Sequence, residues 1–110
     1  MDYIEREILL SFWKVHILHH ASKAPVIGHW IIGELRRHGY EVSPGTLYPM
    51  LLRMEQRGWL TQKVNADKGA KARKEYLLTK KGHKILTILR EQIIELHREV
   101  VLDDEEENLS

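Results

Sequence analysis

The segment that most constrains the fold is a short amphipathic stretch at 43–60, which reads SPGTLYPMLLRMEQRGWL. Apolar side chains recur there at the spacing of one helix face, so they form a stripe that must pack on a core: Leu47, Met50, Leu51 and Met54. The opposite face carries Thr46, Pro49, Arg53 and Gln56, with Tyr48 and Leu52 on the flank between. A helix with this packed back and polar front suits insertion into a DNA major groove.

The ends of this helix are indicated by its capping residues. Ser43 or Thr46 can supply the side-chain oxygen that caps exposed amides, and Gly58 can adopt the left-handed conformation that ends a helix. Pro49 lacks an amide hydrogen and is best tolerated in the first turn. We therefore expect the helix to begin near Thr46, with Ser43 capping a preceding turn.

A β-hairpin is predicted directly after this helix. Residues 59–64 (WLTQKV) have the pattern of a strand, 65–72 (NADKGAKA) form a polar turn, and 73–79 (RKEYLLT) form a returning strand. An ordinary amphipathic surface helix would explain 43–60 alone. A hairpin with a basic tip behind that helix favours a winged helix instead.

Two further helices are predicted before the central one. The first spans 4–20 and is apolar around most of its circumference, with Ile8 and Phe12 on one face, so a partner subunit or a ligand is expected to cover part of it. The second spans 28–38, turns Trp30, Ile31 and Leu35 inward and ends at Gly39. The fold class is mainly α with a small β-hairpin, and residues 1–79 form a winged helix-turn-helix domain.

A long helix over 80–102, capped by Thr79, is predicted to be a dimerisation helix. Its apolar residues follow alternating spacings of three and four, which is a short heptad seam: Leu86, Leu89, Ile93, Leu96 and Val100. Together with Ile8 and Phe12 they form the predicted dimer interface, although so short a seam could also pack only on its own domain. Residues 103–110 (DDEEENLS) are predicted to be an acidic disordered tail, with competition against DNA for the basic surface as the alternative.

Charge is divided unevenly along the chain. Residues 36–84 contain 12 Lys and Arg against 4 Asp and Glu, although the formal net charge of the whole chain is only +1. Basic residues therefore gather where phosphate contact is expected. The absence of cysteine excludes disulfides, and no secretion signal or membrane span is evident, which predicts a cytoplasmic protein without a membrane partner. No catalytic motif is recognisable, so we predict no enzyme activity.

The run HGYEVSPGTLYPMLLRMEQRGWL, with YLLTKKG after it, resembles the PadR family of bacterial winged-helix transcriptional regulators. The similarity covers roughly residues 5 to 100, and its SPGTLYP core is quite specific. This resemblance implies a homodimeric DNA-binding repressor, often released from DNA by a small molecule. Leu52 departs from the family pattern, in which a polar residue is usual. The alternative function is a winged-helix module for protein–protein contact.

Residues that are expected to contact double-stranded DNA are assigned from the resemblance and from the polar face of the helix predicted within 43–60. Those expected to approach the groove are Thr46, Tyr48, Pro49 and Arg53. Ser43 and Gly45 lie where a helix start can meet a phosphate. The wing residues expected to contact the DNA backbone are Lys68, Lys71, Arg73 and Lys74.

Histidine and tryptophan residues suggest weaker hypotheses. His16, His19 and His20 have helical spacing that could hold zinc, nickel, copper or haem, with His29 joining from the next helix. No carboxylate or thiol accompanies them at matching spacing, and histidine is common at helix ends, so we predict no metal and no cofactor. Trp13 and His16 are the predicted contacts for a small-molecule effector, whereas Trp30 and Trp59 are expected in the core.

Overall fold

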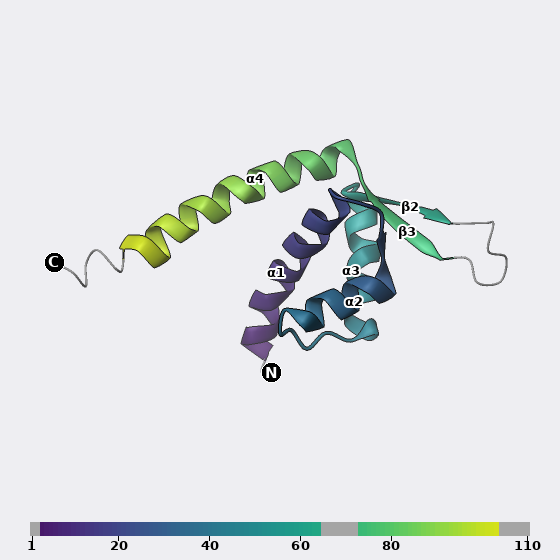
Figure 1. Ribbon diagram of the computed structural model, residues 1–110, viewed down its shortest axis with the longest axis horizontal. Helices are drawn as coiled ribbons and strands as arrows, with labels where there is room; N and C mark the ends of the chain where they lie inside the picture. The colour runs from purple at the N-terminus through teal and green to yellow at the C-terminus, as the bar shows by residue number, and fades with distance from the viewer. Residues whose placement is uncertain (1–2, 65–72, 104–110) are drawn as a thin grey trace.

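The computed structural model describes residues 3–64 and 73–103 of the chain. The elements follow in the order α1 (Tyr3–Ala21), β1 (Val26–Ile27), α2 (Gly28–Arg37), α3 (Pro44–Gln56), β2 (Leu60–Val64), β3 (Lys74–Leu78) and α4 (Lys80–Leu96), and α4 continues as a π-helix over His97–Asp103. Figure 1 shows α1, α2 and α3 grouped together, with the β2–β3 hairpin extending to one side and α4 to the other. This mainly helical winged-helix arrangement confirms the predicted fold class.

The sheet has one more strand than the sequence predicts. Its order is β1-β3-β2 and both pairings are antiparallel, with Val26 opposite Tyr76 and Leu60 opposite Leu78. The predicted hairpin is confirmed as β2 and β3, whereas β1 lies between the helices predicted over 4–20 and 28–38, where no strand was predicted. Because β1 joins the start of α2 to β3, the wing is anchored to the helical body at Glu75 and Tyr76.

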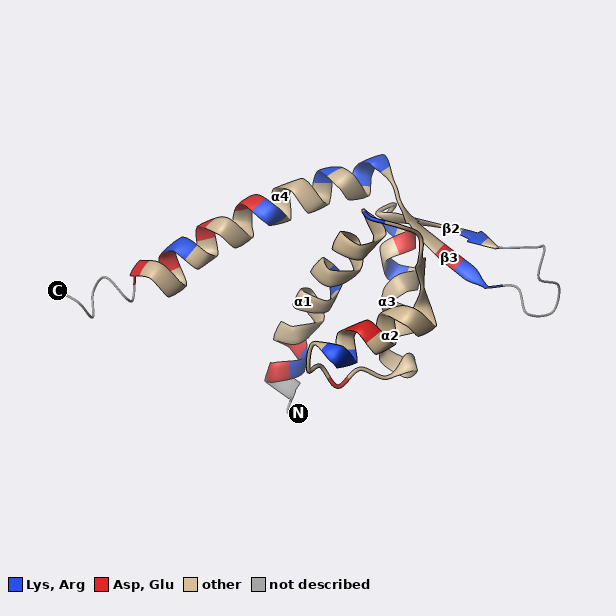
Figure 2. Cartoon of the chain, in the orientation of Figure 1, with Lys and Arg blue, Asp and Glu red and all other residues tan. Residues whose placement is uncertain are grey.

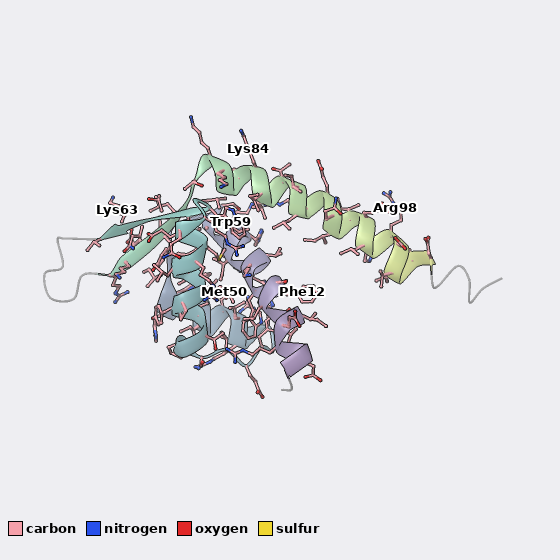
Figure 3. All side chains as sticks on the ribbon, turned by 180° about the vertical axis from the view of Figure 1, so that it is seen from behind. Phe12, Met50, Trp59, Lys63, Lys84 and Arg98 are labelled. Carbon is pink, nitrogen blue, oxygen red and sulfur yellow. The ribbon has the colours of Figure 1, made fainter. Side chains whose placement is uncertain are left out.

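The core lies between the three N-terminal helices and the sheet. All four residues of the predicted stripe on α3 are buried: Leu47, Met50, Leu51 and Met54. They pack with Ile17 and Leu18 of α1 and with Ile31 and Leu35 of α2. Figure 3 shows Met50 on the inner side of α3, toward α1. Burial of this stripe leaves the other side of α3 facing outward.

The start of α3 differs from the prediction. The helix begins at Pro44 with Ser43 at the N-cap, so Pro49 lies inside it rather than in its first turn. Pro49 removes only the hydrogen bond to the carbonyl of Gly45, which lies in the exposed first turn, and this makes the interior proline tolerable. The preceding loop is held by buried Val42, whose carbonyl accepts a hydrogen bond from Arg36 Nε at 3.1 Å. Pro44 itself suits the first helical position because that residue needs no donor.

Trp13 and Trp30 differ from the prediction: Trp13 is buried in the core, and Trp30 is exposed. Trp13 is only 1% exposed and packs edge-on against Tyr40, with ring centroids 6.0 Å apart. Trp30 is 49% exposed, so the prediction that it turns inward is wrong. The physical reason is that α1 packs through a wide face, which includes Trp13, Ile17 and Leu18, whereas α2 is covered only on the side of Ile31 and Leu35.

Hydrogen bonds of Thr79 fix the junction between β3 and α4. The Thr79 side chain accepts a hydrogen bond from the Gly82 amide at 2.9 Å, as predicted for its cap. Its hydroxyl also donates toward the carbonyls of Gly58 and Trp59. Beyond this junction α4 projects outward, and the molecule measures 63 × 32 × 21 Å. Its radius of gyration is 16.5 Å, against about 13 Å for a compact chain of this length.

A substitution at Gly82 is expected to destabilise this junction. A Cβ atom there would overlap the Trp59 carbonyl oxygen and the Leu78 side chain, so backbone would have to move. We expect Gly82→Ala to lower the free energy of unfolding by about 2–3 kcal/mol. Gly33→Ala on the exposed side of α2 is the matched control, because a Cβ atom added there would meet nothing within 4 Å. That variant should instead gain up to ~1 kcal/mol. Equal denaturation midpoints for the two variants would contradict this account.

Candidate nucleic-acid interface

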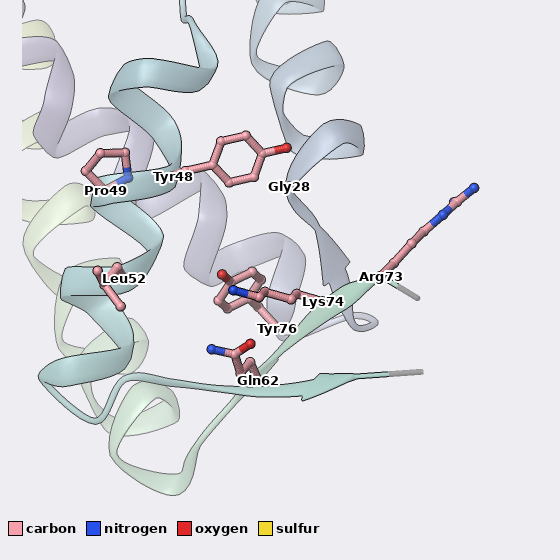
Figure 4. A pocket seen from close by; sticks show the side chains of 8 residues that line it. All are labelled: Gly28, Tyr48, Pro49, Leu52, Gln62, Arg73, Lys74 and Tyr76. Carbon is pink, nitrogen blue, oxygen red and sulfur yellow. The ribbon is translucent and has the colours of Figure 1, made fainter. Parts of the chain in front are cut away.

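The outward side of α3 borders a hollow between this helix and the wing. Tyr48 and Leu52 are about half exposed, and Pro49 beside them is also exposed. The hollow is completed by residues from three other segments: Gly28, Gln62, Arg73, Lys74 and Tyr76. Figure 4 shows Lys74 extending toward the α3 side of the hollow, whereas Arg73 points away from it. Helix and wing therefore form one continuous surface.

Tyr48 is positioned by a glycine at the start of α2. A Cβ on Gly28 would lie against the Tyr48 ring, at 3.3 Å from its hydroxyl oxygen and closer still to ring carbons. In Figure 4 the Tyr48 side chain reaches from α3 toward Gly28. Because Gly28 has no side chain, the Tyr48 ring can approach the start of α2 this closely, and Tyr48 remains about half exposed.

Gln62 and Tyr76, which line the hollow, both interact with Glu55 of α3. Gln62 Nε2 on β2 donates a hydrogen bond to Glu55 Oε1 on α3 at 3.1 Å, which ties the wing to the helix. Tyr76 on β3 is buried, and burial raises the pKa of its phenol, with smaller contributions from Glu55 and Tyr48. The phenol therefore stays neutral near pH 7.

The remaining predicted groove residues lie on the side of α3 that faces α1. Arg6 Nη2 on α1 donates a hydrogen bond to Thr46 Oγ1 at 3.1 Å. Lys14 on α1 has its pKa lowered by burial and then by the positive charges of Arg57 and Arg53. Cationic groups from two helices therefore gather along this flank, and a phosphate would relieve their mutual repulsion.

Sequence reasoning missed the contribution of α1 to this surface. Arg6 and Lys14 lie in a mostly apolar helix, and only the packing of α1 against α3 brings them beside Thr46 and Arg53. Arg57 lies over the Trp59 ring, 5.3 Å from its centroid, so its guanidinium is held at the end of α3. Ser43 and Gly45 are exposed at the start of this helix, where they were expected.

The described part of the wing is basic at its outer end. Lys63 on β2, Arg73 and Lys74 are all exposed there, and Lys63 was not among the predicted residues. Lys68 and Lys71 fall outside the described residues. Figure 2 shows this blue region on the wing and a second one at the start of α4, whereas acidic and basic residues alternate along the rest of α4.

A separate apolar groove of about 700 Å³ runs between α1 and α4. It is lined by most of the predicted dimer residues: Ile8, Phe12, Leu86, Leu89, Ile93 and Leu96. Leu86 is buried in the core of its own chain, whereas Phe12, Ile93 and Leu96 are 51%, 45% and 57% exposed. Val100 lies further along and is also exposed. Figure 3 shows Phe12 projecting from α1 on the side of the free end of α4.

The sequence model of the transcriptional regulator PadR-like family matches residues 17–88, which include α2, α3 and the wing. The chain belongs to this family. The PadR-like chain is also 46% identical over 96 residues to transcriptional regulator Rv3488 of Mycobacterium tuberculosis, a similarity that covers 87% of this chain and 89% of the relative.

Solved structures agree with this assignment. A PadR-like transcription factor from Bacteroides fragilis superposes with a TM-score of 0.77 at 28% identity, over 90% of this chain and 96% of the other. A PadR family transcriptional regulator from Eggerthella lenta gives a TM-score of 0.64 at 27% identity, over 90% and 86% of the two chains. The relatives regulate transcription and are not enzymes, so this PadR-like protein is a transcriptional regulator. None of its described helices is long and apolar enough to cross a membrane.

The predicted effector residues of this PadR-like regulator do not lie together. His16 lines the groove between α1 and α4, but Trp13 is buried on the core side of α1. The prediction that Trp13 contacts an effector is therefore wrong, because only 1% of this residue is exposed. The exposed aromatic side chain in the groove is Phe12, one residue away and about 100° around the helix.

The histidines of the PadR-like chain group differently from the prediction. His16 and His20 on α1 lie close to His38, which follows α2, whereas His19 and His29 are outside this group. Burial lowers the pKa of both His16 and His20, and neighbouring imidazoles lower it further. Both rings are therefore mainly neutral near pH 7. The missed residue, His38, is brought near only by the crossing of α1 and α2.

Proposed function

We propose that this PadR-like regulator is a sequence-specific DNA-binding repressor that acts as a cytoplasmic homodimer and responds to a small molecule. The observation that carries the proposal is the juxtaposition of the exposed face of α3 with the basic wing. Tyr48, Pro49 and Leu52 lie on α3 directly beside Lys74 of β3, around one hollow. Occupancy of a promoter suffices for repression.

Helix α3 would enter the major groove, which is about 12 Å wide and admits one α-helix. Thr46 and Arg53 offer hydrogen bonds to base edges, whereas Pro49 and Leu52 present apolar surface that suits the methyl group of thymine. Ser43 and Gly45, at the start of the helix, lie where a phosphate can approach backbone amides. These residues would read sequence and set the depth of insertion.

The wing and the cationic flank would hold the DNA backbone. Lys63, Arg73 and Lys74 are exposed on the wing. Lys68 and Lys71 of the neighbouring sequence, which lie outside the described residues, are proposed to take the same role. On the other side, Lys14, Arg53 and Arg57 are close enough for their charges to affect one another. Phosphates placed on both sides of α3 would fix its register without specifying sequence.

Arg53→Ala is expected to weaken binding to cognate DNA by about 5- to 150-fold, because a specific arginine contact is worth about 1–3 kcal/mol. The affinity for random DNA should fall much less, so the ratio of the two affinities should shrink. Fluorescence anisotropy with both DNAs measures this ratio. Arg98→Ala, on the π-helix after α4, is the control and should leave both affinities unchanged. Equal losses on cognate and random DNA for Arg53→Ala would contradict the assigned role.

Dimerisation is supported by the apolar surface that a single chain leaves open. Phe12, Ile93 and Leu96 line the groove between α1 and α4 and are about half exposed. The next apolar residues of α4 and its π-helix are exposed too: Ile94, Val100, Val101 and Leu102. An exposed face of this length is typical of a protein interface, and the helix α4 of a second copy has a matching apolar face.

A small-molecule effector is proposed to bind beside the same helices. The groove between α1 and α4 combines the apolar residues Phe12 and Ile93 with the polar side chains His16, Arg90 and Gln92. Such a lining suits a largely apolar ligand with one or two polar groups. Binding would change DNA affinity only as far as the ligand prefers one dimer geometry over another.

The proposal is tested by fluorescence anisotropy on a labelled fragment of the region upstream of the regulator's own gene. Unrelated DNA is added in excess as competitor, and the salt concentration is varied. Binding that survives the competitor and weakens steeply with salt supports a sequence-specific regulator. Binding to the fragment that the competitor abolishes would contradict autoregulation, and absence of any DNA binding would favour a protein-interaction module.

A further inference from the structure

Three imidazoles and one carboxylate meet where α1 crosses the end of α2. One ring nitrogen from each of His16, His20 and His38 lies within 4.8 Å of the other two. Glu34 Oε1 is 3.3 Å from His38 Nε2 and 3.8 Å from His20 Nε2. The groups form two pairs at i, i+4 spacing, His16 with His20 on α1 and Glu34 with His38 at the end of α2.

This arrangement is close to the coordination shell of a transition-metal ion. Zinc binds imidazole nitrogen at about 2.0–2.1 Å, so nitrogen ligands of a tetrahedral site are about 3.4 Å apart. The two distances from Glu34 Oε1 to His20 and His38 are already near this value. The three imidazole nitrogens lie within 4.8 Å of one another, so they would move closer together on binding an ion. Nitrogen-rich sets with one carboxylate suit zinc, nickel and copper rather than magnesium or calcium.

Surrounding contacts orient the ligand groups. The His16 ring packs against Tyr40 with centroids 5.5 Å apart, and His20 packs edge-on against Trp30 at 5.2 Å. Arg37 donates a hydrogen bond to Glu34 Oε2 at 3.2 Å, and it also contacts Oε1 at 2.5 Å. Contacts of this kind limit the rotation of ligand groups. Because Arg37 also contacts Oε1, a bound metal ion would share this oxygen with the guanidinium or displace it. His38 is exposed, which provides an entry path from solvent.

We propose that His16, His20, His38 and Glu34 bind one divalent transition-metal ion of the zinc class in each chain. The ion would link α1 to the end of α2, directly before the loop that leads into α3. His16 also lines the groove between α1 and α4, so an occupied site would adjoin the proposed dimer and effector surface. Binding of the ion depends on one chain alone and does not require the proposed DNA-binding function.

The test is calorimetric titration of Zn²⁺ into chelator-treated protein that carries no histidine tag. Wild type is expected to bind one ion per chain. His38→Ala and His16→Ala should each weaken binding by at least about tenfold, and Glu34→Gln by about tenfold, since loss even of outer-shell groups costs about 10–100-fold. His19→Ala is the matched control, because His19 adjoins His20 in sequence but lies outside the group. Its affinity should stay within about twofold of wild type.

Thermal melting provides a second readout on the same proteins. A hundredfold excess of Zn²⁺ over the wild-type dissociation constant should raise the melting temperatures of wild type and His19→Ala by at least about 5 °C more than that of His38→Ala. Circular dichroism verifies that each variant is folded. The absence of saturable binding at Zn²⁺ concentrations on the order of 100 µM would overturn the proposal. A stoichiometry of half an ion per chain would also overturn it, as would equal losses of Zn²⁺ affinity in His19→Ala and His38→Ala.

Discussion

Replacing Ile93 and Leu96 together by glutamate is expected to convert the proposed dimer into monomers and to weaken operator binding by at least about 100-fold. In a dimer each copy contributes both positions, so four carboxylates would enter an apolar contact without partners. A monomer binds only one half-site of the operator. It therefore loses the increase in affinity that comes from linking two binding sites, which is typically a factor of about 10²–10⁴. The fold of the single chain should persist, because both side chains are about half exposed in it.

Light scattering after gel filtration gives the mass of the complex, and anisotropy gives its affinity for DNA. Glu91→Lys is the matched control, because it changes a charge on α4 about 160° around the helix from Ile93. The control should remain dimeric with nearly unchanged affinity. A double glutamate variant that stays dimeric would show that the groove between α1 and α4 is not the interface.

Removing the three described basic side chains of the wing is expected to weaken DNA binding about as strongly as the loss of the dimer. The triple variant Lys63→Ala, Arg73→Ala, Lys74→Ala would lose three phosphate contacts per chain. Each contact contributes about 0.9 to the slope of log affinity against log salt, so the slope should flatten by about 2.7 per chain. At about 0.1 M salt this corresponds to a decrease in DNA affinity by a factor of about 10²–10³ per chain. The decrease should be the same for cognate and random DNA.

The control carries the same change in charge on a different element. The triple variant Lys80→Ala, Lys84→Ala, Arg98→Ala changes residues of α4 and its π-helix. Lys80 and Lys84 belong to the second basic region, to which the proposal assigns no phosphate contact. Anisotropy over a range of salt concentrations should show a much smaller change of slope for this triple variant. Equal changes in slope for the two triple variants would mean that net charge, and not the position of the wing, governs binding.

Elements with long, regular patterns were predictable from sequence. The apolar stripe of α3 has four members at helical spacing, and all four are buried. Gly39 and Gly58 have positive φ angles of 92° and 80°, as expected for residues that end helices. The wing strands follow from the residue types at 59–64 and 73–79.

Features that depend on a crossing of distant segments could not be predicted. Strand β1 has only two residues, too few to show an alternating pattern, and it exists because Val26 pairs with Tyr76. His38 seemed unrelated to the histidines of the first helix until the crossing of α1 and α2 placed it beside His16. The burial of Trp13 could not be predicted for a similar reason. Helix α1 is apolar around nearly its whole circumference, so its sequence does not indicate which side packs into the core.

Selection of binding sites from a random-sequence DNA library is the measurement that tests the central claim most directly. If two copies of α3 read successive major grooves, the enriched sites should be inverted repeats with half-site centres about 10–10.5 base pairs, or a multiple of this, apart. The Arg53→Ala variant should give a weaker motif from the same library. No enrichment over the starting library would contradict sequence-specific binding, and enrichment of a single asymmetric half-site would contradict recognition by a symmetric dimer.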